Sequence, residues 1–401
     1  MADLPDGEPA PPDGSLPNPS IAEGFSAYVH IPFCAVRCGY CDFNTYTNRN
    51  FGPGAGLADF PESLGREIAL SRAVLEGDGQ ITTVFFGGGT PTMLDSGQLT
   101  GVLASLNDHF GIAPGAEITT EANPETVTRE SLRQLREGGF TRVSFGMQSA
   151  VPRVLSILDR QHRVSQVPRV VEWAREAGLD VSLDLIYGAP GETESEWRSS
   201  LQAALSMEPD HISAYALTVE PGTKMGAQVR RGQICLPDPD EQADRYELAA
   251  GVLEASGYHW YEISNWAKTG HECQHNLAYW RGANWWGYGP GAHSHVGGTR
   301  FWNVKHPLAY ANKLLDNTSP VAAREVLTQA ELAEEDVMLR IRLAEGIAIP
   351  EGVGTNVVAG FISDGLVDPS AAFGGRLVLT LKGRLLADTV TRALWEAMPS
   401  F

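Results

Sequence analysis

Short apolar runs alternate with segments of helical spacing along the first half of the chain. Apolar residues recur at helical spacing over residues 99–110, and a capping box formed by Thr193 and Glu196 introduces another helical segment. Strands and helices that alternate in this way predict an α/β fold with parallel strands and right-handed crossovers. The apolar runs predict six strands, at residues 27–31, 82–86, 117–121, 142–146, 180–186 and 211–217.

Two architectures fit this alternation: a partial (β/α)6 barrel and a doubly wound sheet. The clustered cysteines, the glycine run and several isolated polar residues all follow the ends of predicted strands. In α/β barrels, this edge of the sheet carries the chemistry. The positions of the unusual residues therefore favour a partial barrel, which we expect over residues 23–230.

Before and after the predicted barrel, the regular alternation of strands and helices is absent from the sequence. Residues 1–22 are rich in Pro, Gly and Asp and poor in apolar residues, which predicts a disordered tail. Residues 218–235 read as a connector, followed by a helix over residues 240–256 and a strand over residues 258–263. We therefore expect residues 231–320 to comprise a connector and a region dense in Trp, Tyr and His.

The last part of the chain, residues 321–401, predicts a small C-terminal domain. Helical spacing appears over residues 332–343 and 355–364, two short strands are expected at residues 366–367 and 376–379, and a last helix begins at Gly383. This order resembles a winged-helix module. Many such modules bind DNA, but 7 basic against 11 acidic residues in this segment favour a lid or a partner surface.

Composition narrows the class of protein. The 401 residues carry a formal net charge of −19, which argues against nucleic acid as a partner because that binding depends on basic surface. No apolar run approaches the roughly 20 residues of a membrane span, and the first residues lack the features of a signal peptide. Five cysteines, three of them clustered, favour metal ligation in a reducing compartment, so a cytoplasmic location is expected.

The cysteine cluster is the most informative motif. Cys34, Cys38 and Cys41 follow the first predicted strand with three and two residues between them. Structural zinc normally has four protein ligands, so the triplet leaves a zinc site completed by His30 or Asp42, inert core cysteines, or an incompletely ligated iron–sulfur cluster. In a cubane cluster, three thiolates leave one iron free to bind a further ligand.

Other polar and glycine motifs follow later strands. Three consecutive glycines, residues 87–89, allow close approach of the backbone to a ligand, although a glycine run in isolation is more often a tight turn. Asp184 and Arg160 supply a carboxylate and a guanidinium that can hold hydroxyl and carboxylate groups. The ordinary alternative for these two residues is a salt bridge at the rim of the barrel.

The cysteine spacing, the preceding Tyr28-x-His30-Ile-Pro-Phe segment and Tyr40 resemble the radical S-adenosylmethionine (SAM) superfamily. The resemblance implies a 4Fe–4S cluster on the three cysteines, whose free iron binds SAM and supports its cleavage to a 5′-deoxyadenosyl radical. Within the superfamily, the chain resembles the oxygen-independent coproporphyrinogen III oxidase-like family. This resemblance places ten residues around SAM: Tyr28, Tyr40, Gly88, Gly89, Thr90, Glu121, Gln148, Arg160, Asp184 and Ala216.

Aromatic and histidine residues are dense over residues 271–295. They fit either a packed aromatic layer or a flat apolar slot with one axial imidazole, as haem requires. The motif His275-Asn276-x-x-Tyr279-Trp280 resembles the HemW haem chaperone branch of the family, which implies that these four residues bind haem. The oxidases of the family carry a fourth cysteine where this chain has Phe43, and the nearby Cys273 is a competing haem ligand.

The resemblance implies a haem chaperone on a radical-SAM scaffold, which delivers haem to client haem proteins of respiration. The alternative is an oxygen-independent coproporphyrinogen III oxidase, in which the radical drives decarboxylation to protoporphyrinogen IX. A radical-SAM enzyme with an unrelated substrate is a third reading, so catalysis and the turnover of SAM stay open. The resemblance also implies a flavodoxin- or ferredoxin-type reductant and is compatible with a homodimer.

Overall fold

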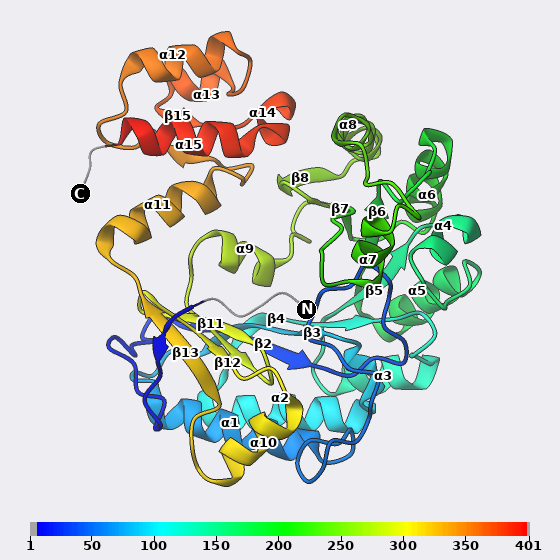
Figure 1. The fold of residues 1–401 in the computed structure, drawn as a ribbon, viewed down its shortest axis with the longest axis vertical. Coiled ribbons are helices and arrows are strands. Elements are labelled where there is room, and N and C mark those ends of the chain that lie inside the picture. Colours follow the sequence, from blue (N-terminus) through cyan, green and yellow to red (C-terminus); the bar gives the residue numbers. More distant parts are fainter. Residues whose placement is uncertain (1–5, 399–401) are drawn as a thin grey trace.

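The computed structural model describes residues 6–398 and contains one large mixed sheet (Figure 1). Its thirteen strands follow the order β1-β13-β12-β11-β10-β2-β3-β4-β5-β6-β7-β9-β8. The central strands from β10 to β7 are parallel, whereas both ends of the sheet are antiparallel. The predicted α/β fold is thus present, and its sheet extends further than the sequence pattern indicated.

The six predicted parallel strands all form, in the predicted order. They are β2 (Phe25–Ile31), β3 (Ile81–Gly88), β4 (Ile112–Ala122), β5 (Arg142–Gln148), β6 (Asp180–Tyr187) and β7 (His211–Ala216). Most residues of these strands are buried, since parallel sheets are covered on both faces. Their side chains form the main core together with apolar residues of the flanking helices.

Helices that follow the strands cover the outside of this sheet. They are α1 (Phe60–Val74), α2 (Ser96–Phe110), α3 (Arg129–Glu137), α4 (Pro152–Ile157), α5 (Gln166–Ala177) and α6 (Glu194–Ser206), with a short 3-10 helix, η1 (Pro91–Met93). The predicted capping box is present, because the Thr193 side chain accepts a hydrogen bond from the Glu196 backbone and Glu196 bonds back. Gly178 ends α5 in the left-handed conformation.

Residues 231–320, expected as a connector and an aromatic and histidine-rich region, contribute strands to the main sheet. The predicted helix and strand are present as α8 (Pro239–Ala255) and β8 (His259–Glu262), but the remaining elements extend the main sheet at both edges. The strand β10 lies parallel to β2, where Trp286 packs against Phe301 with ring centroids 4.9 Å apart. The other elements are α7 (Lys224–Arg230), β9 (Asn265–Ala267), α9 (Gln274–Trp280), β10 (Trp285–Tyr288), β11 (His293–Val296), β12 (Thr299–Asn303), α10 (Pro307–Leu315) and β13 (Val321–Val326).

The prediction of a disordered N-terminal tail is wrong for residues 6–22, and residues 1–5 lie outside the described part. The strand β1 (Glu8–Pro9) pairs with β13, and Glu8 forms a 2.7 Å ion pair with Arg324. Ile21 is 1% exposed and belongs to the main core. A segment poor in apolar residues is ordered here because β13 offers it an unpaired edge and the core accepts Ile21.

The C-terminal module has its own small core, formed by residues such as Ile341, Phe361 and Leu394. Its predicted helices are present, but the strand pair differs: β15 pairs with β14, and Val367 contributes only a single bridge to Leu379. In Figure 1 these helices lie at the top, connected to β13 through α11. The elements are α11 (Gln329–Arg340), β14 (Ile347–Ala348), α12 (Thr355–Ser363), α13 (Pro369–Phe373), β15 (Arg376–Leu377), α14 (Leu381–Leu385) and α15 (Ala387–Ala397).

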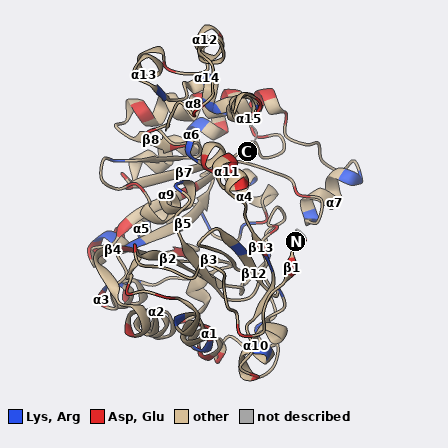
Figure 2. Cartoon of the chain, turned by 90° about the vertical axis from the view of Figure 1, so that its left-hand side faces the viewer, with Lys and Arg blue, Asp and Glu red and all other residues tan. Residues whose placement is uncertain are grey.

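Charged residues of both signs are scattered over the helices and loops, as Figure 2 shows. Within residues 6–398, every helix is too short or too polar to cross a lipid bilayer.

Candidate functional site

A cavity of about 640 Å³ lies at the carboxyl ends of β2 to β7, and the cysteine loop forms one side of it. The loop is held against β3, because Gly89 N donates to Ile31 O at 2.8 Å. Asn44 fixes its far end by donating to the carbonyls of Pro290 and Lys305, at 2.8 and 2.9 Å. The three cysteines are therefore presented to the cavity from a loop that is anchored at both ends.

All three predicted cluster ligands line this cavity. Cys34 accepts a hydrogen bond from Thr90 Oγ1 at 3.8 Å, and Cys38 accepts one from Arg160 Nη1 at 3.7 Å. Burial raises the pKa of the Cys34 thiol to about 11, so a metal must displace its proton to bind the sulfur. The three sulfurs share a common opening, and hydrogen-bond donors lie beside Cys34 and Cys38.

The geometry does not favour the zinc alternative with His30 as fourth ligand. Both ring nitrogens of His30 are engaged, Nδ1 with the Tyr28 hydroxyl at 3.1 Å and Nε2 with the Asn44 carbonyl at 3.0 Å. Among the described residues, three possible metal-ligand atoms lie within 4.8 Å of one another at one place, Asp180, Asp210 and His271, and the cysteine loop is not part of it. The cysteine loop is thus a better fit to a cluster than to a single ion.

The glycine segment after β3 brings its backbone close to the cavity. Gly88 has a φ of +104°, and a Cβ there would lie 2.4 Å from Nδ1 of His30. A Cβ on Gly89 would lie 2.6 Å from the carbonyl oxygen of Phe33. Side chains are excluded at both positions, so main-chain groups line the cavity beside the cysteines. One of them, Gly88 N, donates to Glu121 Oε2 at 3.2 Å.

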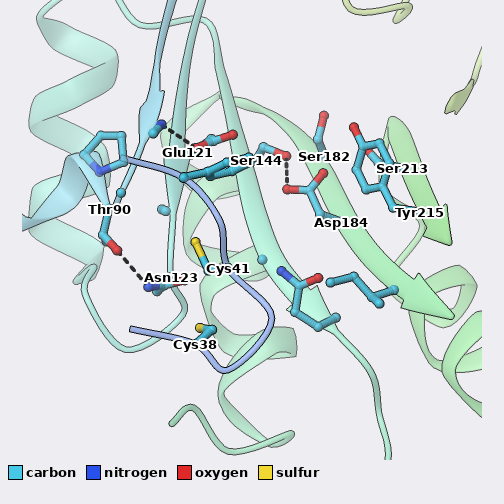
Figure 3. Close-up of a pocket in the computed structure, with 18 of the residues that line it drawn as sticks. Cys38, Cys41, Thr90, Glu121, Asn123, Ser144, Ser182, Asp184, Ser213 and Tyr215 are labelled. Atoms are coloured by element: carbon cyan, nitrogen blue, oxygen red, sulfur yellow. Dashed lines mark hydrogen bonds between the residues drawn. The ribbon is translucent and has the colours of Figure 1, made fainter. Parts of the chain in front are cut away.

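Polar side chains from β5, β6 and the loops beside the strands form the floor of the cavity (Figure 3). Arg160 donates to the carbonyl Oδ1 of Asn123 at 2.5 Å, and Asn123 Nδ2 donates to Thr90 Oγ1 at 3.0 Å. On the other side, Ser144 Oγ donates to Asp184 Oδ2 at 2.9 Å. The floor therefore combines one guanidinium with carboxyl and hydroxyl groups, which suits a ligand with amino, carboxylate and ribose groups.

Two half-buried carboxyl groups, those of Glu121 and Asp184, give this floor its electrostatic character. Burial and the charge of Asp184 raise the pKa of Glu121 to about 8, and burial raises the pKa of Asp184 as well. A cationic ligand placed beside them would favour their ionised forms. The pair thus fits a positively charged group better than a neutral one.

The structure brings all ten predicted SAM residues to this one cavity: Tyr28, Tyr40, Gly88, Gly89, Thr90, Glu121, Gln148, Arg160, Asp184 and Ala216. Gln148 has a φ of +61°, and its side-chain oxygen is buried without a hydrogen-bond partner. An orphaned acceptor of this kind fits a ligand that donates a hydrogen bond.

The lining also includes polar residues that were not among the ten predicted for SAM, such as Asn123, Ser144, Ser182 and Ser213. A signal for one of them was present in the sequence. Ser182 and Asp184 alternate with the buried Val181, Leu183 and Leu185 along β6, which places both polar side chains on the inner face.

The predicted haem segment forms α9 and lies at the inner end of the same cavity. His275 is 2% exposed, and both of its ring nitrogens are hydrogen-bonded at 2.8 Å, Nδ1 to Thr83 Oγ1 and Nε2 to the Tyr279 hydroxyl. Because Thr83 Oγ1 already donates to Ser26, it accepts from Nδ1–H, and Nε2 accepts from Tyr279. Burial lowers the pKa of His275 to about 3. Its lone pair is therefore occupied.

The other members of the haem motif have different surroundings. Asn276 Nδ2 donates to Glu262 Oε1 at 3.1 Å and lines the cavity, whereas Trp280 lines neither cavity described here and packs beside Leu343. Cys273 is buried, and its thiol donates to Glu117 Oε1 at 3.4 Å. The motif thus supplies a wall of the cavity together with a hydrogen-bond network.

A second cavity of about 540 Å³ lies between β10–β12 and α11. It is next to the first, because Tyr28, Phe43, Gly88 and Tyr279 line both. Phe43, which stands where related oxidases have a fourth cysteine, is 57% exposed. The outer wall of the second cavity includes Trp285, His293, His295, Arg300, Glu335, Met338 and Leu339.

The fold and the cysteine loop define a protein of the radical SAM class, and the Radical SAM superfamily profile matches residues 28–204. The heme chaperone HemW of Mycobacterium tuberculosis is 47% identical over 379 residues, which cover 94% of this chain and 96% of that protein. HemW of Bacillus subtilis is 34% identical over 377 residues, which cover 91% and 97%. The chain therefore belongs to the heme chaperone HemW family of radical SAM proteins.

A solved structure is also similar. Coproporphyrinogen III oxidase (HemN) from Escherichia coli, described as a radical SAM enzyme, matches with a TM-score of 0.79 and 24% identity, covering 94% of this chain and 91% of that chain. At this identity the likeness concerns the fold alone, and it confirms the predicted radical-SAM architecture.

Proposed function

We propose that this protein is a haem chaperone on a radical-SAM scaffold, which binds a 4Fe–4S cluster, SAM and haem and passes haem to respiratory haem proteins. The observation that carries the proposal is the 47% identity to a heme chaperone HemW over 94% of the chain. In this proposal, residues 23–230 hold the cluster and SAM, while residues 231–320 and the module over residues 321–401 border the haem.

Membership of the radical SAM superfamily implies a 4Fe–4S cluster and SAM. In our proposal Cys34, Cys38 and Cys41 hold the cluster, which supplies an electron and a free iron site for SAM. Arg160 and Asp184 then orient the polar groups of SAM, with the ten residues predicted from the sequence around it. The orphaned oxygen of Gln148 and the glycine-lined wall support this placement.

In this proposal, the segment that forms α9 borders the haem. Tyr279 lines both cavities, and its hydroxyl is held by Nε2 of His275 at 2.8 Å. We assign His275 as the residue that fixes the position of Tyr279, whose ring is then a wall of the haem site. Asn276 of the same segment is held by Glu262. Trp280 belongs to the same segment as a packing residue beneath the wall.

One experiment separates this proposal from the coproporphyrinogen oxidase reading. Anaerobically purified protein with a reconstituted cluster is incubated with haem and, separately, with coproporphyrinogen III, SAM and a reductant. We expect saturable haem binding and no protoporphyrinogen IX. Conversion of coproporphyrinogen together with no haem binding would replace the chaperone with the oxidase. The client proteins, the flavodoxin- or ferredoxin-type reductant and a homodimer stay predictions.

A further inference from the structure

The second cavity contains a histidine whose ring is available. His293 of β11 is exposed and lines the cavity, and its ring makes no hydrogen bond with any of the described residues. The ring is stacked on the buried Trp302, with ring centroids 5.8 Å apart and planes 28° apart. A ring that is supported on one side and has no hydrogen bond can offer a nitrogen lone pair to a metal.

The walls around His293 combine flat and flexible apolar groups. Trp285 and Phe43 supply aromatic surface, and Met338 and Leu339 approach from α11. A volume of about 540 Å³ falls within the roughly 300–1,000 Å³ of small-molecule and cofactor pockets. Apolar and aromatic walls of this kind suit a planar macrocycle.

Positive charge lies beside the same histidine. Arg300 of β12 lines the second cavity together with His293. Arg300 is paired with Glu325 at 2.7 Å and with Glu335. A carboxylate of a ligand in this cavity would therefore share the Arg300 guanidinium with these two side chains.

The other histidines near the two cavities are less suited to bind a metal. Both nitrogens of His275 are hydrogen-bonded, as described above. His295 directs Nδ1 to the Ala283 carbonyl at 3.4 Å, and its Nε2 is buried without a partner beside Trp285, whose ring centroid is 5.1 Å away. His30 has partners on both nitrogens. His293 is thus the histidine of the second cavity with an accessible ring.

We infer that haem binds in the second cavity with the imidazole of His293 as its axial iron ligand. Phe43 and Tyr279 then form the partition between this haem and the cavity of the cysteine loop, since both residues line both spaces. The inference rests on the proposed function, and it assigns to His293 the axial role that the sequence motif suggested for His275.

The test compares the haem spectra and affinities of His293→Ala and His275→Ala, with the exposed His259→Ala of β8 as a matched control. We expect His293→Ala to shift the Soret band and weaken haem binding by about tenfold or more, with the band restored by added imidazole. His259→Ala should bind haem as the wild type does. An unaltered spectrum in His293→Ala would overturn the inference even if haem binding itself is intact.

A second variant makes the test independent of iron ligation. Leu339→Trp fills the second cavity from α11, so haem affinity should fall while SAM affinity is unchanged, because Leu339 does not line the first cavity. Equal haem affinity in this variant would place haem elsewhere and overturn the inference. Wild-type protein that binds no haem would overturn the proposed function as well, which distinguishes the two failures.

Discussion

Asp184 is half-buried in the middle of β6, where its carboxylate accepts a hydrogen bond from Ser144 at 2.9 Å. We predict that Asp184→Ala weakens SAM binding about ten- to hundredfold, since one charged or bidentate contact contributes roughly 1.5–3 kcal/mol. Iron content should not change, because the cysteines lie on a different loop. Equilibrium SAM binding checks the prediction, with Asp108→Ala on the exposed face of α2 as control; equal affinity in all three proteins would contradict it.

The buried carboxyl group of Glu67 makes the free energy of unfolding depend on pH. Glu67 of α1 accepts hydrogen bonds from Tyr310 at 2.5 Å, from Gly289 N at 2.7 Å and from Asn303 at 2.7 Å, with no cation among these partners. Burial raises its pKa to about 7. In the unfolded chain this carboxyl ionises near pH 4.5. The contribution of Glu67 to the free energy of unfolding is therefore complete below that pH and is lost as the pH rises to about 7.

We therefore predict that Glu67→Gln removes this part of the pH dependence. The free energy of unfolding of the wild type, taken relative to that of the variant, should fall by up to about 3 kcal/mol as the pH rises from 4.5 to 7. Denaturant unfolding at several pH values measures it. A difference that stays constant with pH would mean that the carboxyl of Glu67 ionises normally in the folded protein.

The sequence indicated which residues belong to the site more readily than which atoms each of them contacts. The cysteine spacing and the glycines are local in sequence, and the SAM residues predicted by resemblance all reach one cavity. The axial role suggested for His275 depends on what its ring nitrogens contact. One contact, Thr83, comes from β3, and the motif around His275 contains no information about it.

At the scale of elements, the six strands from β2 to β7 were predictable because most of their residues are buried and form short apolar runs. The strands β10 to β12 were not, since they are four or five residues long and separated by glycine-rich turns. Their aromatic residues suggested a binding slot. The parallel pairing of β10 with β2 joins distant parts of the sequence, so no local pattern indicates it.

The N-terminal segment gives a direct test of this extended sheet. Ile21 is 1% exposed in the main core, so we predict that Ile21→Ala lowers the free energy of unfolding by about 2–5 kcal/mol. Glu8→Ala, which removes only the surface ion pair with Arg324, should cost less than about 1 kcal/mol. Both values come from denaturant unfolding. A cost for Ile21→Ala as small as that for Glu8→Ala would indicate that the segment is disordered in solution.

For the whole molecule, two neighbouring cavities share a partition, one lined by the cysteine loop and the other by β11, β12 and α11. The C-terminal module supplies one wall of the second cavity through Met338 and Leu339. Its sequence predicted a lid or a partner surface, and in our proposal this wall is a lid over the haem. A client protein would then approach the side of the molecule formed by α11 and β11.

Delivery of haem is the central claim, and haem transfer measures it most directly. The haem-loaded protein is mixed with membranes from haem-depleted cells, in the presence of a protein that sequesters free haem, and respiratory oxidase activity is recorded. We predict that the loaded protein restores activity under these conditions, whereas the same amount of free haem does not. Retention of haem by the protein with no recovery of oxidase activity would contradict the account.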